Sequence, residues 1–299
     1  METTVTRPTF LDGTISVPGD KSISHRALLL NSISNGLAKV SGLSFGEDVR
    51  SSIECLKQLG TVIHTCIASE TATISGVNGT GFRAPTKALN AGNSGTTLRM
   101  LAGILAAQPF SSTITGDASL LSRPVKRIIT PLTKMGAKLT GQNNNTHPPL
   151  IIEGTQLSGI EYTLPIPSAQ VKSCILLAGL LADSPTTIHQ PVPSRDHTER
   201  ILHSMGAKIN VSGNTIMLEP GPLEPLDIDI PGDISSAAFW MVAACIHPNS
   251  RLKISNVGIN PTRSGILQIL ADMGADISIE HLAKQGGEPV ANISASSSI

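Results

Sequence analysis

The sequence predicts an α/β protein made of four copies of one unit of about 70 residues. Two short sequence patterns each recur four times along the 299 residues and alternate with one another. The apolar fraction is 40% and charged residues make up 15%, a composition that supports a large core rather than a disordered chain. At roughly 150 residues per domain, the length allows about two domains.

The first pattern consists of the end of a helix, a glycine and a short strand. The four glycines are Gly60, Gly136, Gly206 and Gly274, and they are spaced 76, 70 and 68 residues apart. A glycine after a helix readily takes the left-handed conformation of a C-cap, and the alternating residues that follow favour a strand. Four copies at nearly constant spacing indicate a repeated unit rather than chance.

The second pattern consists of a strand, a turn with Pro or Gly, a helix start rich in Ser, Thr and Asp, and an apolar helix. Its copies begin near Ile15, Gly92, Ile166 and Ile230. Ser, Thr and Asp are good N-caps because their side-chain oxygens accept hydrogen bonds from unpaired backbone N–H groups. Each unit therefore contains two helices and several short strands, and four units fill the chain.

The composition also excludes several classes of protein. Lys plus Arg total 22 and Asp plus Glu total 22, without a basic block, which argues against a nucleic-acid-binding surface. Aromatic residues are 2%, and the longest apolar run has ten residues, so we expect no membrane partner. The four cysteines lie far apart and the histidines form no metal-binding motif, so we expect buried free thiols and no metal site. The N-terminal residues lack the pattern of a signal peptide, and we expect a cytoplasmic protein.

The polar helix starts contain the candidate binding residues. A helix N-terminus presents unpaired N–H groups and the positive end of its dipole, which favours anions. In the first start, Lys21 and Ser22 begin the helix, and Arg26 lies one turn after Ser22 on the same face. These residues could hold a phosphate, or they could belong to a capped surface helix with solvated charges.

The other helix starts are ambiguous when each is taken alone. Gly95 lies in a Gly-rich segment that an ordinary tight turn explains, and Arg123 could cap the helix that follows it. Gln170 and Lys172 open the most apolar helix, and we expect them to face a ligand or water. Ser194–Glu199 suggests catalysis, although a capping box and local salt bridges explain it nearly as well. Together, several cationic, hydroxyl-rich helix starts from different repeats fit a ligand with more than one anionic group.

Six longer motifs contain these segments, in this order: VPGDKSISHR (17–26), NAGNSGT (90–96), GDASLLSRP (116–124), SAQVKS (168–173), SRDHTE (194–199) and PGDISSAA (231–238). In order and spacing they resemble the 5-enolpyruvylshikimate-3-phosphate synthases, the 3-phosphoshikimate 1-carboxyvinyltransferases of the shikimate pathway. The resemblance runs from about residue 8 to about residue 293. A related family that acts on a UDP-sugar shares the fold but not the motifs at 168–173 and 194–199.

The resemblance implies an inside-out α/β barrel fold in two domains, each made of three repeats in the family. Residues 20–230 would form a complete three-repeat domain on the shikimate 3-phosphate side. Residues 1–19 with 231–299 would form a partial second domain. Four of the family's six repeats are found here, so we expect the C-terminal third of the family's sequence to be absent from this chain.

The resemblance also implies an activity. The enolpyruvyl group of phosphoenolpyruvate would be transferred to the 5-hydroxyl of shikimate 3-phosphate with release of phosphate, without a metal or an organic cofactor. Two functions stay open: the bulk of such an enzyme, or a truncated, inactive module that binds shikimate 3-phosphate. We expect a monomer that acts on these small molecules.

The site residues follow from the resemblance motif by motif. Those implied for shikimate 3-phosphate are Lys21, Ser22, Arg26, Ser168, Ala169, Gln170, Ser194 and Arg195. Those implied for phosphoenolpyruvate are Lys21, Gly95, Arg123 and Gln170. Lys21 would contact both substrates and is the catalytic candidate, whereas the carboxylate proposed as general base in the family would fall beyond residue 299. Arginine and helix N-termini suit phosphate groups, which agrees with the interpretation of the helix starts.

Overall fold

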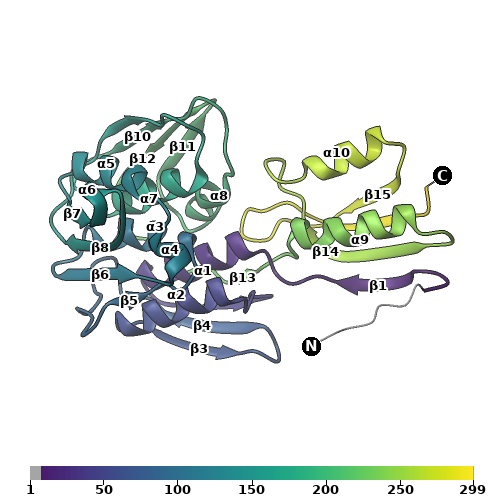
Figure 1. Ribbon diagram of the computed structural model, residues 1–299, viewed down its shortest axis with the longest axis horizontal. Coiled ribbons are helices and arrows are strands. Elements are labelled where there is room, and N and C mark those ends of the chain that lie inside the picture. The colour runs from purple at the N-terminus through teal and green to yellow at the C-terminus, as the bar shows by residue number, and fades with distance from the viewer. Residues whose placement is uncertain (1–7, 299) are drawn as a thin grey trace. The chain divides into compact units, whose positions relative to one another are not determined.

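The chain forms two compact units in the computed structural model, which describes residues 8–298 (Figure 1). The large unit is residues 21–229. The small unit combines residues 8–20 with residues 230–298, so it is built from two separate stretches of chain.

The strands of the described residues form four four-stranded sheets with one shared pattern. In each sheet the first two strands are parallel, and the third and fourth follow in antiparallel pairing. The sheets of the large unit are β13 (Ile228–Asp229), β2 (Leu37–Ser41), β4 (Thr71–Ser75) and β3 (Val62–Cys66); β5 (Leu89–Asn90), β6 (Ser111–Thr115), β8 (His147–Glu153) and β7 (Lys138–Gly141); and β9 (Glu161–Thr163), β10 (Thr186–His189), β12 (Thr215–Leu218) and β11 (Ile209–Ser212). The sheet of the small unit is β1 (Asp12–Ser16), β14 (Arg251–Gly258), β16 (Val290–Ser296) and β15 (Asp276–His281). This fourfold pattern confirms the predicted α/β repeat.

The first and fourth copies of the repeat exchange their leading strands. In the middle copies, a strand, an inner helix and a parallel strand follow one another: β5, α3 (Gly95–Leu105) and β6, then β9, α7 (Ala169–Leu180) and β10. By contrast, β1 precedes α1 (Lys21–Ile33) but pairs with β14, and β13 pairs with β2. Each leading strand therefore completes the sheet of the other copy.

The large unit has its sheets outside and three helices inside. In Figure 1 the inner helices α1, α3 and α7 lie between the sheets of this unit. All three are buried on every side except near their first residues. Gly103 allows α3 to approach α7 closely, since a Cβ there would lie 2.3 Å from the carbonyl oxygen of Cys174. This arrangement agrees with the expected inside-out fold.

The outer helices of the repeat end at a glycine, as the first sequence pattern predicts. They are α2 (Glu47–Gln58), α5 (Lys126–Lys134), α8 (His197–Ser204) and α10 (Gly265–Asp272); the short helices α4 (Ala118–Leu121) and α6 (Gln142–Asn145) complete the large unit. The glycines two residues past the four outer helices, Gly60, Gly136, Gly206 and Gly274, have φ values of 93°, 97°, 81° and 80°. The left-handed C-caps are therefore confirmed, and β3, β7, β11 and β15 follow them.

The predicted N-caps are confirmed at three of the four helix starts. Ser94, Ser168 and Asp233 accept hydrogen bonds from the backbone N–H groups of Thr97, Val171 and Ser235, at 3.1, 3.4 and 2.9 Å. These three residues begin α3, α7 and α9 (Ile234–Ile246). Among residues 8–298 no helix is long and apolar enough to cross a membrane.

The small unit packs one face of α9 on its sheet. Ile234, Ala237 and Met241 are buried there. Phe239 and Ile246, on the same helix, are 80% and 78% exposed. The helix is apolar all round but covered on one side only.

Candidate active site

Hydrogen bonds join the starts of α3 and α7. The Gln170 side chain, in the first turn of α7, donates from Nε2 to Thr96 Oγ1 at 3.0 Å. Its Oε1 accepts a 2.8 Å hydrogen bond from Arg99 Nη1. Both partners belong to α3, so Gln170 and the Gly95 segment are brought together.

Arg26 joins α1 to α7 and α8. Its guanidinium donates to Ser173 Oγ at 2.8 Å, to Thr198 Oγ1 at 2.7 Å and to the carbonyl oxygen of Ser22 at 2.9 Å. The side chain is buried, with 3% of Arg26 exposed. These bonds fix a cation one turn inside the start of α1, next to the Ser168 turn of α7.

A third set of hydrogen bonds links α1, α2 and α3. His25 Nδ1 and Ser52 Oγ are 2.8 Å apart, and Ser52 Oγ lies 2.8 Å from Thr97 Oγ1. Thr97 Oγ1 donates to the N-cap oxygen of Ser94 at 2.7 Å. Burial lowers the pKa of His25 to about 3, so the imidazole is neutral at pH 7. The three inner helices are thus cross-linked pairwise at their N-terminal turns.

Lys21 is the exposed cation of this cluster. Its Nζ lies 2.9 Å from Asp48 Oδ2, and the two side chains are 54% and 29% exposed. Asp48 belongs to the first turn of α2, and its carbonyl oxygen accepts a hydrogen bond from Thr97 Oγ1. An ion pair with this exposure costs little to rearrange, so the ammonium remains accessible to a ligand.

Arginines gather around Gly95 at the start of α3. A Cβ on Gly95 would lie 2.6 Å from Arg99 Nη1 and 3.5 Å from Arg123 Nη1. Burial, together with the positive charges of Arg127 and Arg123, lowers the pKa of Arg99 to about 10. Arg123 is held by hydrogen bonds to Asn93 and to Ser119 Oγ. Like charges held this close favour an anion near the N-terminus of α3.

The segment before α8 carries two further predicted residues. Ser194 donates from both its backbone nitrogen and its hydroxyl to Gln190 Oε1, each at 3.2 Å. Arg195 is exposed. The local ion pair expected for this region is present, because Arg200 Nη2 lies 2.9 Å from Asp196 Oδ2.

The expectation that Lys172 faces a ligand or water is wrong. The side chain is fully buried, and its Nζ lies 2.6 Å from Glu199 Oε1. Four residues into α7, Lys172 points towards the start of α8 instead. The charge of a carboxylate on the outer helix of the same repeat decides the direction of this side chain, and nothing local to residues 168–173 signals it.

The predicted site residues all belong to the large unit. They are Lys21, Ser22, Arg26, Gly95, Arg123, Ser168, Ala169, Gln170, Ser194 and Arg195. The polar helix starts do not by themselves predict the cross-linking roles of His25, Arg99 and Ser173. A signal for them exists, because each is a polar residue at the fifth position of its inner helix.

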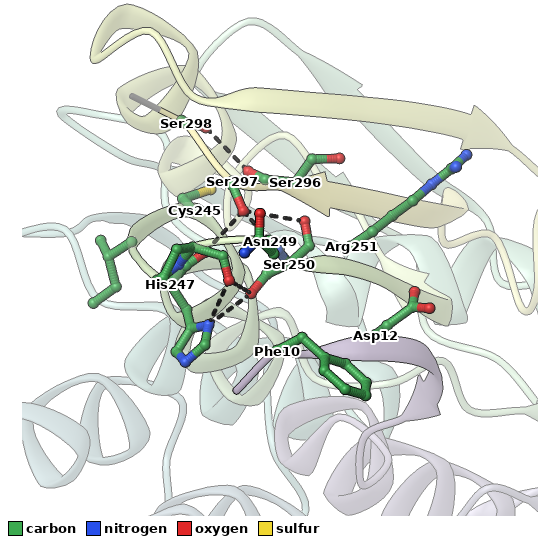
Figure 2. A pocket seen from close by; sticks show the side chains of 12 residues that line it. Phe10, Asp12, Cys245, His247, Asn249, Ser250, Arg251, Ser296, Ser297 and Ser298 are labelled. Atoms are coloured by element: carbon green, nitrogen blue, oxygen red, sulfur yellow. Dashed lines mark hydrogen bonds between the residues drawn. The ribbon is translucent and has the colours of Figure 1, made fainter. Parts of the chain in front are cut away.

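A cavity of about 770 Å³ lies in the small unit (Figure 2). Its polar groups bind one another: Ser250 N donates to Ser297 Oγ at 2.6 Å, and Ser297 Oγ donates to the carbonyl oxygen of His247 at 2.8 Å. These bonds fasten the end of α9 to β14 and β16. Residues 8–298 contain no group of three His, Cys, Asp or Glu side chains that could hold a metal ion.

Fold and site define an α/β repeat protein with a cluster of cationic and hydroxyl side chains at the starts of its inner helices. The family model of EPSP synthase (3-phosphoshikimate 1-carboxyvinyltransferase) matches residues 5–296. The chain therefore belongs to the EPSP synthase family, an enzyme family.

Individual relatives agree with this assignment. A 3-phosphoshikimate 1-carboxyvinyltransferase of Herpetosiphon aurantiacus is 49% identical over 98% of this chain and 68% of its own length. One from Crocosphaera subtropica is 50% identical over 95% of this chain and 63% of its own. The solved EPSP synthase from Acinetobacter baumannii superposes with a TM-score of 0.92 at 46% identity, covering 96% of this chain and 65% of that one. The chain thus spans about two thirds of the length of these relatives.

Proposed function

We propose that the large unit binds shikimate 3-phosphate and phosphoenolpyruvate, and that the chain supplies most of a 3-phosphoshikimate 1-carboxyvinyltransferase. The observation that carries the proposal is the set of three inner-helix starts, cross-linked and rich in cations and hydroxyls. Two anionic substrates need at least two such groups of donors close together, and the large unit offers them on α1, α3 and α7.

The phosphate of shikimate 3-phosphate is assigned to the start of α7 and to α1. Ser168, Ala169 and Gln170 form the first turn of α7, where backbone N–H groups are unpaired. Ser22 and Arg26 stand beside it, because Arg26 donates to Ser173 on the same helix. Ser194 and Arg195, before α8, are assigned to the shikimate moiety.

Phosphoenolpyruvate is assigned to the start of α3. The absence of a side chain on Gly95 lets the Arg99 guanidinium lie against the helix start, with Arg123 Nη1 close by. Gln170 belongs to both parts of the site because its side chain spans from α7 to Thr96 and Arg99. A bidentate arginine contact to phosphate or carboxylate is stronger than a neutral hydrogen bond and fixes orientation.

The reaction that fits these assignments is addition followed by elimination. The 5-hydroxyl adds to C2 of phosphoenolpyruvate and gives its proton to the general base of the completed site, while C3 gains a proton and becomes a methyl group. The tetrahedral ketal then loses phosphate from C2 and one methyl proton from C3. Lys21 is the exposed ammonium assigned to both substrates, so we assign it the role of proton donor and electrostatic partner. The buried cross-links preorganise the donors, which is the expected source of most of the rate.

The small unit is proposed to hold one repeat of three. In the large unit, three inner helices cover one another, whereas α9 leaves Phe239 and Ile246 exposed. Two further copies of the repeat would bury this face. Four units of six is two thirds, in agreement with the 63% to 68% of the relatives' length that the chain spans. The completed molecule is proposed to be a cytoplasmic monomer.

A phosphate-release assay tests the transferase proposal. The 299-residue chain alone should release no phosphate above background, and a protein completed with two further repeats should turn over. Loss of a general acid–base partner typically costs about 10²–10⁴ in rate, and an open site also fails to exclude water. Turnover by the unassisted chain at the rate of the completed one would contradict the partial small unit. Binding of shikimate 3-phosphate without turnover in either form would favour the alternative, a binding module.

Calorimetry tests the binding assignment directly. Shikimate 3-phosphate should bind the chain more tightly than shikimate does, since the phosphate is the group assigned to the helix starts. Arg26→Ala should weaken this binding by about 1.5–3 kcal/mol if Arg26 makes a charge-assisted hydrogen bond to the ligand. Equal affinity for shikimate and its 3-phosphate would exclude a phosphate site here.

A further inference from the structure

A buried ion pair lies directly behind the segment that carries Ser194 and Arg195. Lys172 Nζ and Glu199 Oε1 are 2.6 Å apart, and the side chains are 0% and 6% exposed. Lys172 belongs to the second turn of α7 and Glu199 to the first turn of α8. The pair therefore joins two helices whose starts carry different parts of the proposed site.

The ammonium also holds the segment itself. Lys172 Nζ donates to the carbonyl oxygen of Ser194 at 3.3 Å and to Gln190 Oε1 at 3.4 Å. That same Gln190 oxygen accepts from the backbone nitrogen and the hydroxyl of Ser194. The three ammonium protons thus have three acceptors: Glu199, Gln190 and the Ser194 carbonyl. The Ser194 backbone is held at its carbonyl by Lys172 and at its N–H by Gln190.

Stability alone does not account for this pair. Moving two charges out of water is costly, and a well-packed apolar pair of similar volume is often as stable or more stable. Glu199 Oε2 adds to the cost, because it is buried and has no hydrogen-bond partner within the described residues. Two apolar side chains in these positions would not make the hydrogen bonds that Lys172 makes to Ser194 and Gln190.

We propose that Lys172 and Glu199 are positioning residues that hold the Ser194–Arg195 segment in its binding conformation before the ligand arrives. The inference rests on the proposed binding of shikimate 3-phosphate. It adds that affinity for the shikimate moiety depends on two side chains whose polar atoms do not touch the ligand. A segment already ordered loses less entropy when the ligand binds, which raises affinity.

The test replaces the pair without leaving a buried charge. In Lys172→Met with Glu199→Gln, hydrogen exchange of residues 190–195 in the unliganded protein should become about tenfold faster. Affinity for shikimate 3-phosphate should fall about tenfold, while affinity for inorganic phosphate, assigned to the Ser168 turn, should change less than about twofold. The matched control is Lys208→Met with Glu219→Gln, since Lys208 Nζ and Glu219 Oε2 form an exposed pair at 3.2 Å. The control should change neither exchange nor affinity.

A second variant keeps the result interpretable if the double replacement fails to fold. Gln190→Met leaves the ion pair and the bond from Lys172 to the Ser194 carbonyl in place but removes the acceptor of the Ser194 backbone nitrogen and hydroxyl. It should therefore change local exchange and affinity in the same direction, by a smaller factor. Faster exchange spread evenly over α7 and α8, with equal loss of inorganic phosphate binding, would overturn the proposal in favour of a purely structural pair. Unchanged exchange at 190–195 would overturn it as well. If the unaltered chain does not bind shikimate 3-phosphate, the proposed function fails, and the exchange measurement still decides the positioning role.

Discussion

Helices α7 and α9 occupy the same place in the repeat but have different surroundings. Both follow a polar N-cap, and both are apolar on all sides, which is typical of a buried helix. In α7 every residue from Val171 to Leu180 is buried. In α9 one face packs on the sheet, and Phe239, Trp240 and Ile246 are exposed. The sequence of α9 is therefore that of a helix buried on all sides, although the small unit buries only one of its faces.

The fifth residue of each inner helix distinguishes the two units chemically. His25, Arg99 and Ser173 occupy this place in the large unit, and each makes a hydrogen bond to a neighbouring helix. In α9 the same place is Ala238. The repeat therefore supplies the fold, while substitutions at one position of it supply the polar cross-links of the proposed site.

The largest expected difference between the two helices is in the free energy of unfolding. Leu176→Ala, at a fully buried position of α7, should destabilise the large unit by about 2–5 kcal/mol because it removes packing and leaves a cavity. The matched change on α9, Ile246→Ala, should cost less than about 0.5 kcal/mol, since that side chain is 78% exposed. Urea unfolding followed by circular dichroism measures both values. Similar costs at the two positions would mean that α9 is covered in solution.

The second expected effect concerns the cross-link that only the large unit has. His25 has a folded pKa of about 3 against about 6.5 in the unfolded chain, so below pH 6.5 the unfolded chain binds more protons. The stability due to neutral His25 is therefore complete above pH 6.5 and decreases as the pH falls towards 3. Between pH 7 and pH 5 the loss should be about 2 kcal/mol.

Unfolding at several pH values in His25→Gln isolates this contribution. The variant cannot titrate at residue 25, so its stability should change less between pH 7 and pH 5 than that of the unaltered chain. Carboxylates contribute to both proteins, and the difference between the two pH profiles removes them. Parallel profiles would show that His25 is protonated, or solvent-accessible, in the folded protein.

The sequence predicts features whose cause is local. The C-cap glycines and the N-caps Ser94, Ser168 and Asp233 depend on residues within one helical turn, and all are confirmed. The exchange of β1 and β13 between copies was not predicted, because strand pairing depends on segments far apart in the chain. Lys172 was misjudged for the same reason, since Glu199 lies in another part of the repeat.

The third effect uses a glycine at the first position of one helix in each unit. Gly95→Ala should displace the Arg99 guanidinium from Gln170, because the added Cβ would lie 2.6 Å from Arg99 Nη1. Affinity for phosphoenolpyruvate, which is assigned to the start of α3, should fall about tenfold, or about 1.4 kcal/mol, with the fold intact. Gly265→Ala at the start of α10 is the matched control, because a Cβ there meets open space. Calorimetry measures the affinities of both variants. Equal affinities would show that Gly95 does not belong to the anion site.

The smallest expected effect on stability is at the exposed face of α9. Phe239→Gln together with Ile246→Gln should change the free energy of unfolding by less than about 0.5 kcal/mol, because both side chains are already in contact with water. The same pair should reduce binding of a hydrophobic dye, since large exposed apolar patches are where such molecules bind. In a protein completed with two further repeats, the identical pair should instead cost several kcal/mol, as large-to-small or polar changes in a core do. A cost above about 2 kcal/mol in the 299-residue chain would contradict the exposed face, and an unchanged cost after completion would show that the added repeats do not pack on α9.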